Sequence, residues 1–528
     1  MPVSFRETAA SPYRKQGECM GFKQNNELTM WNSTPYVKEN VFIHQEPEKQ
    51  PLPSFSQARG RLPQPVWEGH PEVLNCYWRA WELAFGNLCQ PRPGTGFVSN
   101  FIDTAFNGCT FMWDSSFILM FGKYGQRIFN FQGTLDNFYS HQHQDGFICR
   151  EIDEATGEDR FTRFDPAATG PDVMGWCEWE YFKNFGDMDR LQKVFPPLLA
   201  YHEWLRINHT WRDGSYWSSG WGCGMDNILR HQDLPGHTIS YTHGHMVWND
   251  ICMQALLSGR VLIEMARLLG RESDVKNLLE EQEQLARLIN DKLWDEQTAF
   301  YYDLWKDGRL NMVKHVGAYW ALLAGIVPED RADRFIAHLE NEREFKLPCR
   351  IPALSADSPN FKEAGGYWRG GIWAPTNYMV LKGLERYGRY GLAHEIGENY
   401  LQNVVGVFNK TNTLFELYEP TPDDQGNPRP GLNCHRDFVG WTGLAPISVL
   451  FEFVLGIKPD AEHNTLLWDI RLLEKHGIEQ YPFGKDATLT LLCEKRERPS
   501  EEPQVTVRSD RPVTVELRWE GGSKTIQA

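Results

Sequence analysis

Residues 247–269 read VWNDICMQALLSGRVLIEMARLL, and residues 274–293 read DVKNLLEEQEQLARLINDKL. The first stretch is apolar on more than one face, which is typical of a helix that is buried on several sides. The second sets leucine and isoleucine at helical spacing against a glutamate-rich face, and so predicts a helix with one side in water. A fully buried helix followed by a partly solvent-exposed helix is expected where outer helices surround inner ones.

This alternation of apolar and amphipathic helices extends over most of the chain and predicts about twelve helices. Besides the two stretches above, we expect helices at 72–88, 115–124, 135–143, 175–184, 188–208, 316–323, 329–342, 374–386, 392–407 and 441–455. Pro196 falls inside the fifth of these and predicts a kink, or a break between two shorter helices. The series predicts a mainly α fold, a closed (α/α)6 barrel. An open solenoid is the alternative, but no fixed sequence repeat is visible.

The chain changes character on both sides of the helical region. Residues 1–68 are rich in Pro, Gln and Asn and lack a helical period, so we expect a short extended arm that wraps around the protein. We assign residues 69–457 to the barrel and residues 458–528 to a small antiparallel β appendage. Within the appendage, apolar and polar residues alternate at 487–493, 505–508 and 513–519.

The composition argues against several classes of protein. A formal net charge of −16 over 528 residues disfavours nucleic acid or an anionic membrane as the main partner, because both attract basic surfaces. No run of about 18 apolar residues is present, and the N-terminus lacks the apolar segment of a signal peptide, so we expect a cytoplasmic protein. The eleven cysteines are scattered and form no CxxC pair, which favours reduced thiols over disulfides or a zinc site.

The strongest functional signal lies at residues 216–230, which read YWSSGWGCGMDNILR. This stretch gathers tryptophans and glycines around one acid, Asp226, without helical or strand periodicity. Aromatic faces can stack on sugar C–H groups, and glycines let the backbone approach a ligand, so the composition suits a carbohydrate site. A buried glycine-rich turn with a capping aspartate is the alternative, and this stretch alone does not decide between them.

A second acid occupies a similar setting at Glu416, in the sequence LFELYEP of residues 414–420. Glycoside hydrolysis needs two carboxyl groups, one to protonate the leaving oxygen and one to activate water or attack the sugar. Glu419 is a rival for the second role, because one loop can turn either acid inward. Pro420 restricts Glu419 to extended geometry, so we expect Glu416 and Tyr418 to face the pocket together while Glu419 turns away.

Four loop motifs follow one another in the order seen in a known group of enzymes. They are FMWDSSF at 111–117, GMDN at 224–227, YWRGGIW at 367–373, and ExYxP at 416–420 followed by GWT at 440–442. Over most of its length, from about residue 70 to 457, the chain resembles the inverting α-glycosidases of glycoside hydrolase families 63 and 37. That group includes processing α-glucosidases, trehalases and bacterial mannosylglycerate hydrolases.

The resemblance implies an (α/α)6 barrel that hydrolyses an α-linked glycoside, with a glucoside as the first expectation, from the non-reducing end and with inversion. It implies that Asp226 is the general acid and Glu416 the general base. Ten further residues are expected to bind the sugar: Trp113, Asp114, Trp176, Trp221, Asn227, Tyr367, Trp368, Arg369, Tyr418 and Trp441. We expect no cofactor and no metal, and the partner is a small oligosaccharide or glycoside.

The chain departs from the family pattern at two places. The family usually follows its acid with Asn-Ser-Pro-Arg, whereas here Ile228 and Leu229 stand between Asn227 and Arg230. We therefore expect the wall near the leaving group to differ. The large N-terminal β-sandwich of the processing glucosidases cannot fit into residues 1–68, which makes the small bacterial members the closer match.

The roles of the two acids carry physical expectations. Trp217, Trp221 and Met225 surround Asp226 in the sequence and are expected to desolvate it and raise its pKa, as a general acid requires. The base must be ionised, and Arg369 or Tyr418 could keep it so.

The sequence is also compatible with other functions. One alternative is a phosphorylase or lyase on the same fold. A phosphorylase needs an anion pocket, where Glu416 would repel phosphate. A non-catalytic sugar-binding barrel is the alternative from another class, and it would tolerate the loss of either acid.

Overall fold

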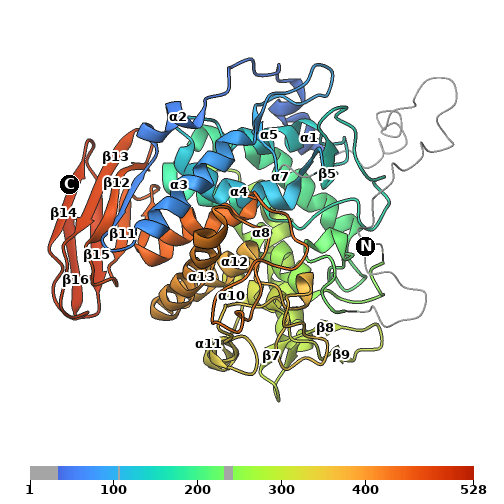
Figure 1. The fold of residues 1–528 in the computed structure, drawn as a ribbon. Helices are drawn as coiled ribbons and strands as arrows, with labels where there is room; N and C mark the ends of the chain where they lie inside the picture. Colours follow the sequence, from blue (N-terminus) through green and yellow to red (C-terminus); the bar gives the residue numbers. More distant parts are fainter. Residues whose placement is uncertain (1–33, 105–106, 231–241) are drawn as a thin grey trace, which may run out of the picture.

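The computed structural model describes residues 34–104, 107–230 and 242–528. Helices are its main regular structure, as predicted (Figure 1). The main helical segments are α3 (Pro71–Gly86), α4 (Met112–Gly122), α5 (Gly133–Ser140), α6 (Met174–Phe185), α7 (Met188–Asn208), α8 (Asn249–Leu269), α9 (Lys276–Leu288), α10 (Trp320–Ala324), α11 (Glu329–Ile336), α12 (Ala374–Arg386), α13 (Tyr390–Thr411) and the π-helical segment η12 (Ala445–Val454). In the three described ranges, no helix is long and apolar enough to cross a membrane.

The sequence difference between α8 and α9 follows from what each helix touches. Helix α8 packs against α6, α7, α9 and α10, so side chains on several of its faces are buried. Helix α9 lies outside it, and buries only Leu278, Leu285 and Leu288 among its residues. The remaining face of α9 is charged and reaches water, which is the arrangement that its amphipathic pattern predicts.

The same division into inner and outer helices continues around the molecule. The most fully buried segments are α4, α6, α8, α10, α12 and η12. Each of these six segments contacts the following one of the six, in the order given. The last, η12, contacts the first, α4, so the series of contacts closes on itself. Helices α3, α7, α9 and α13 pack against this inner series from outside.

The C-terminal strands form two four-stranded sheets, drawn in red at one end of Figure 1. One sheet has the order β1-β12-β13-β14 and the other β10-β11-β15-β16. The strands are β1 (Gln64–Trp67), β10 (Ile457–Asp460), β11 (Thr465–Asp469), β12 (His476–Phe483), β13 (Ala487–Cys493), β14 (Val505–Ser509), β15 (Thr514–Trp519) and β16 (Gly522–Gln527). The sheets are not purely antiparallel, because β11 and β15 pair in parallel, and β1 comes from the N-terminal arm.

One expectation for the first half of the chain was wrong, and another was wrong in part. The described part of the N-terminal arm is not extended throughout, because the short helices α1 (Pro35–Lys38) and α2 (Phe55–Ala58) interrupt it. Polar residues cap both helices, which satisfies their first backbone N–H groups locally. Helix α7 runs unbroken through Pro196 and Pro197, so the predicted break is absent, while the alternative, a kink, stays a prediction. Since the prolines are neighbours, the missing backbone donors fall within one turn, and buried residues on either side hold the helix together.

Candidate active site

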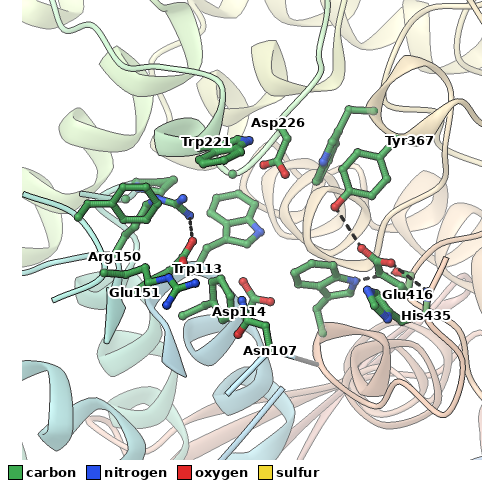
Figure 2. Close-up of a pocket in the computed structure, with 18 residues that line it drawn as sticks. Asn107, Trp113, Asp114, Arg150, Glu151, Trp221, Asp226, Tyr367, Glu416 and His435 are labelled. Atoms are coloured by element: carbon green, nitrogen blue, oxygen red, sulfur yellow. Dashed lines mark hydrogen bonds and ion pairs between the residues drawn. The ribbon is translucent and has the colours of Figure 1, made fainter. Parts of the chain in front are cut away.

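One pocket brings together most of the residues that the sequence singled out (Figure 2). Its volume is about 330 Å³, which is the size of a small-molecule site. Eight of the expected residues line it: Trp113, Asp114, Trp221, Asp226, Tyr367, Trp368, Glu416 and Trp441. The lining also contains residues that were not expected there: Asn107, Phe111, Arg150, Glu151, Arg160, Phe161, Gly170, Pro171, Gly224 and His435.

Asp226 follows a tight glycine-rich turn. The 3-10 turn η5 (Trp221–Cys223) ends at Gly224, which adopts a positive φ of 76°. A Cβ atom at position 224 would lie 2.7 Å from the ring of Trp113. Only glycine therefore combines this backbone conformation with the close approach of the turn to the indole. The packing fixes where the chain enters the residue that carries the carboxyl group.

The electrostatic surroundings of Asp226 favour its protonated form. Burial raises the pKa of this carboxyl to about 6; Arg150 opposes the increase, and the charges of Glu151 and Glu416 add to it. The expected direction of the shift is confirmed. The aromatic surroundings differ in part, because Trp217 lines a separate small cavity rather than this pocket. A carboxyl group with this pKa can hold a proton in weakly acidic solution and give it up.

A buried ion cluster anchors the chain after Asp226. The guanidinium of Arg230 contacts Asp250 at 2.5 Å and Asp303 at 2.7 Å, and all three side chains are buried. Ile228 and Leu229, the residues that depart from the family motif, are buried as well. The arginine of that motif is thus held in place although the residues before it differ.

Asp114 lies in the first turn of α4 and faces the same pocket. Its Oδ1 atom is buried and has no hydrogen-bond partner among the described residues. Burial raises the pKa of Asp114 well above the ordinary range, and the charges of Asp226 and Glu416 act in the same direction. A buried polar atom without a partner is unfavourable, so this oxygen is suited to accept a hydrogen bond from a ligand hydroxyl.

Arg150 and Glu151 form a wall of the pocket that was not predicted. They lie where β4 (Cys109–Phe111) pairs antiparallel with β5 (Glu151–Asp153), directly before α4. The two side chains form an ion pair at 2.5 Å, and the Arg150 guanidinium lies 4.5 Å from the ring centre of Phe161. An adjacent Arg-Glu pair is a common surface pattern in sequence. Only the strand pairing brings it beside the acids.

Glu416 is held by two hydrogen bonds. The Tyr367 hydroxyl donates to one of its carboxylate oxygens at 3.2 Å, and the backbone N–H of His435 donates to the other at 3.1 Å. Burial raises the pKa of Glu416 above its usual value, although both hydrogen bonds oppose the increase. Tyr367 has a positive φ of 63°, which is uncommon for a residue with a side chain and marks a constrained loop.

The neighbours of Glu416 separate the two candidate bases. Glu419 forms an ion pair with Arg429 at 2.5 Å, so it turns toward a structural partner as expected. Tyr418 was expected to face the pocket, and this was wrong, because its hydroxyl accepts a hydrogen bond from the Phe415 N–H at 3.2 Å. The chain bends at Glu416, and that bend interrupts the alternation on which the expectation depended.

Three other residues that were expected to bind the sugar are not among those that line the pocket. Trp176 lies in the core, where its ring stacks on Tyr378. The Asn227 side chain accepts a hydrogen bond at 2.8 Å from the backbone N–H of Trp368, and so joins the acid-bearing turn to the loop at 365–371. Arg369 points its Nε at the carbonyl of Asn227 at 3.4 Å. The hydroxyl of Tyr367, rather than Arg369 or Tyr418, is the side-chain partner of Glu416.

A known protein family matches the part of the chain that carries this pocket. The model of the mannosylglycerate hydrolase MGH1-like glycoside hydrolase domain matches residues 109–442, which include all of the pocket residues except Asn107. The chain belongs to this MGH1-like family of glycoside hydrolases. The resemblance to families 63 and 37 is thereby confirmed, and the protein is an enzyme that hydrolyses glycosides.

Relatives of the chain carry names that refer to different substrates. A mannosylglycerate hydrolase from Thermus thermophilus is 25% identical over 58% of this chain and 88% of its own length. A probable mannosyl-oligosaccharide glucosidase from Schizosaccharomyces pombe is 26% identical over 50% of this chain and 34% of its own length. The crystal structure of a family 63 mannosylglycerate hydrolase from Thermus thermophilus in complex with glucose has a TM-score of 0.55 at 21% identity, and the alignment covers 70% of this chain and 99% of that one. The last similarity concerns the fold alone.

Proposed function

We propose that this glycoside hydrolase is an exo-acting, inverting α-glycosidase with Asp226 as general acid and Glu416 as general base. The observation that carries the proposal is that both carboxyl groups line one pocket while coming from different loops. Inversion requires roughly 6.5–9.5 Å between the two groups, so that a water molecule fits between the base and the sugar. The ion pair of Glu419 with Arg429 favours Glu416 over its rival.

The residues divide the chemistry as follows. Asp226, with a pKa of about 6, donates its proton to the glycosidic oxygen. Glu416 takes a proton from water, which then attacks the anomeric carbon from the opposite face. The hydrogen bond from Tyr367 stabilises Glu416 in its ionised form before this transfer. Asp114 accepts hydrogen bonds from sugar hydroxyl groups and orients the ring.

The fold proposal follows from the helix contacts. The six inner segments form the inner ring of an (α/α)6 barrel, and the helices packed outside them form the outer ring. The barrel occupies residues 69–457, between the N-terminal arm of residues 1–68 and the appendage of residues 458–528. The closed series of contacts from α4 to η12 and back to α4 supports the ring.

We propose an α-glucoside as the substrate. We also propose that the enzyme is cytoplasmic. A second substrate class, α-glycosides of a small hydroxy acid, is favoured by two arginines on the pocket wall. Arg150 and Arg160 line the pocket, and in Figure 2 Arg150 lies at the opposite end from Glu416. Guanidinium groups there would suit a carboxylate on the leaving group, since arginine binds carboxylates through paired hydrogen bonds. Two relatives are named mannosylglycerate hydrolase.

The experiment uses purified protein and a panel of α-linked disaccharides, glucosylglycerate and mannosylglycerate. Proton NMR identifies the first anomer released from the best substrate. Early β-anomer from an α-linked substrate supports inversion, whereas early α-anomer contradicts it. Asp226→Asn should lower turnover by a factor on the order of 10² to 10⁴. Near-native turnover in that variant would rule out the proposed acid. Preference for mannosylglycerate would exclude the glucoside, whereas preference for glucosylglycerate would keep the glucoside and support the hydroxy acid as leaving group.

A further inference from the structure

A buried histidine lies beside the pocket but outside it. His202, on α7, is completely buried, and each of its ring nitrogens faces a carboxylate. Nδ1 lies 2.7 Å from Asp172, and Nε2 lies 2.9 Å from Glu281. Since both partners accept hydrogen bonds, both nitrogens must donate, which requires the imidazolium form. Burial by itself lowers the pKa of His202, but the charge of Glu281 and the hydrogen bonds to Glu281 and Asp172 raise it to about 10.

The two carboxylates connect His202 to two segments near the pocket. Asp172 belongs to the first segment, and Glu281 holds the second through a hydrogen bond. Asp172 follows Gly170 and Pro171, which line the pocket wall. Glu281, on α9, accepts a hydrogen bond from the hydroxyl of Tyr216 through its second oxygen. Tyr216 begins the stretch that leads through η5 to Asp226. The pocket wall and the start of the acid-bearing stretch are therefore joined through one imidazolium.

The contacts that join Asp172, His202 and Glu281 depend on the positive charge of His202. Two carboxylates, Asp172 and Glu281, approach the same ring, and without the positive charge they would be buried neighbours of like sign. Breaking a buried ion pair by removing one partner leaves an uncompensated charge and drives rearrangement. The rearrangement would act on the segments that carry Pro171 and Tyr216. A displacement of about 1 Å in a catalytic group can reduce turnover by roughly 10²-fold.

We infer that His202 is a positioning residue for the general acid: as a fixed cation between Asp172 and Glu281, it sets where the acid-bearing stretch lies against the pocket wall. The inference depends on the proposed role of Asp226. Misplacement of an acid impairs proton donation to the leaving group more than it impairs sugar binding. The loss of turnover on replacing His202 must consequently depend on how much the leaving group needs protonation.

The test compares two substrates of the same sugar. The first is the best α-glycoside from the panel, whose alkoxide needs a proton to leave. The second is the corresponding α-glycosyl fluoride, whose fluoride ion leaves with little assistance from a general acid. His202→Gln and Tyr216→Phe should each lower kcat on the glycoside by about 10- to 100-fold. On the fluoride kcat should fall by less than about 3-fold, and KM for the glycoside should change little.

Matched controls separate positioning from general damage. His476→Gln removes another completely buried histidine, in β12, whose Nδ1 contacts the Glu474 carbonyl at 2.8 Å; burial lowers its pKa to about 4. This variant should leave the ratio of the two rates unchanged. Far-UV circular dichroism and thermal melting verify that each variant folds.

The outcomes are distinct. Equal losses on both substrates in the His202 and Tyr216 variants would overturn the inference. If His202→Gln does not fold, Tyr216→Phe decides, because it removes one hydroxyl and keeps the ring. An unchanged rate ratio in that variant would contradict the positioning role. Near-native turnover of Asp226→Asn on the glycoside would instead refute the proposed function, whatever the other variants show.

Discussion

Replacing Gly224 with alanine tests whether the turn before Asp226 depends on glycine. Two separate physical costs apply. The residue has a positive φ of 76°, where residues with a Cβ atom pay about 1–2 kcal/mol. The new Cβ would also lie 2.7 Å from Trp113, which is closer than a van der Waals contact, so the indole or the turn must move. Such overpacking costs about 1–3 kcal/mol in a dense environment.

A second glycine separates these two costs. Gly214 has a similar φ of 83°, but a Cβ atom there would meet nothing within 4 Å. Gly214→Ala should therefore destabilise the fold by about 1–2 kcal/mol, from backbone strain alone. Gly224→Ala should destabilise it by about 2–5 kcal/mol, the sum of strain and overpacking. Because the clash lies two residues from Asp226, only Gly224→Ala should also lower kcat/KM, by about 10²-fold.

The assay combines thermal unfolding with steady-state kinetics on the best substrate of the panel. Gly224→Ala should show the larger decrease in melting temperature and the only large decrease in kcat/KM. Equal melting temperatures for the two variants would show that Trp113 yields to the new methyl group at no cost. Unchanged kcat/KM in Gly224→Ala would refute the claim that this contact positions the acid.

Three further predictions concern the base, its rival and the core. Tyr367→Phe removes a donor to ionised Glu416, so the pKa of that carboxyl should rise further and the acidic limb of the kcat/KM profile should move to higher pH; a limb that stays in place or moves down argues against Glu416 as base. Glu419→Gln should keep near-native turnover, while Glu416→Gln should lose a factor on the order of 10² to 10⁴; the reverse result would exchange their roles. Lys123→Met breaks a fully buried ion pair and should cost about 3–5 kcal/mol in thermal or denaturant unfolding, whereas Lys475→Met, at an exposed pair, should leave the transition nearly unchanged.

The sequence by itself determined the helical part of the fold with some accuracy. Helix α12 begins and ends at the expected residues, and so does α7, in spite of its two prolines. The reason is that a helix buries side chains at a fixed spacing along the chain, so the pattern is readable locally. The two acids could be found for a related reason. Asp226 and Glu416 each lie in short motifs whose aromatic and glycine content is visible without the fold.

Only the tertiary structure decided which side chains surround those acids. Glu416 receives its hydrogen bond from Tyr367, a residue 49 positions away, and not from its neighbour Tyr418, because a bend at Glu416 breaks the local alternation. Arg150 reaches the pocket through the pairing of two three-residue strands, which leave no periodic signal. The same holds for β1, which joins the C-terminal sheet. Pairing between segments distant in sequence depends on the packed chain as a whole, and single-sequence periodicity carries no record of it.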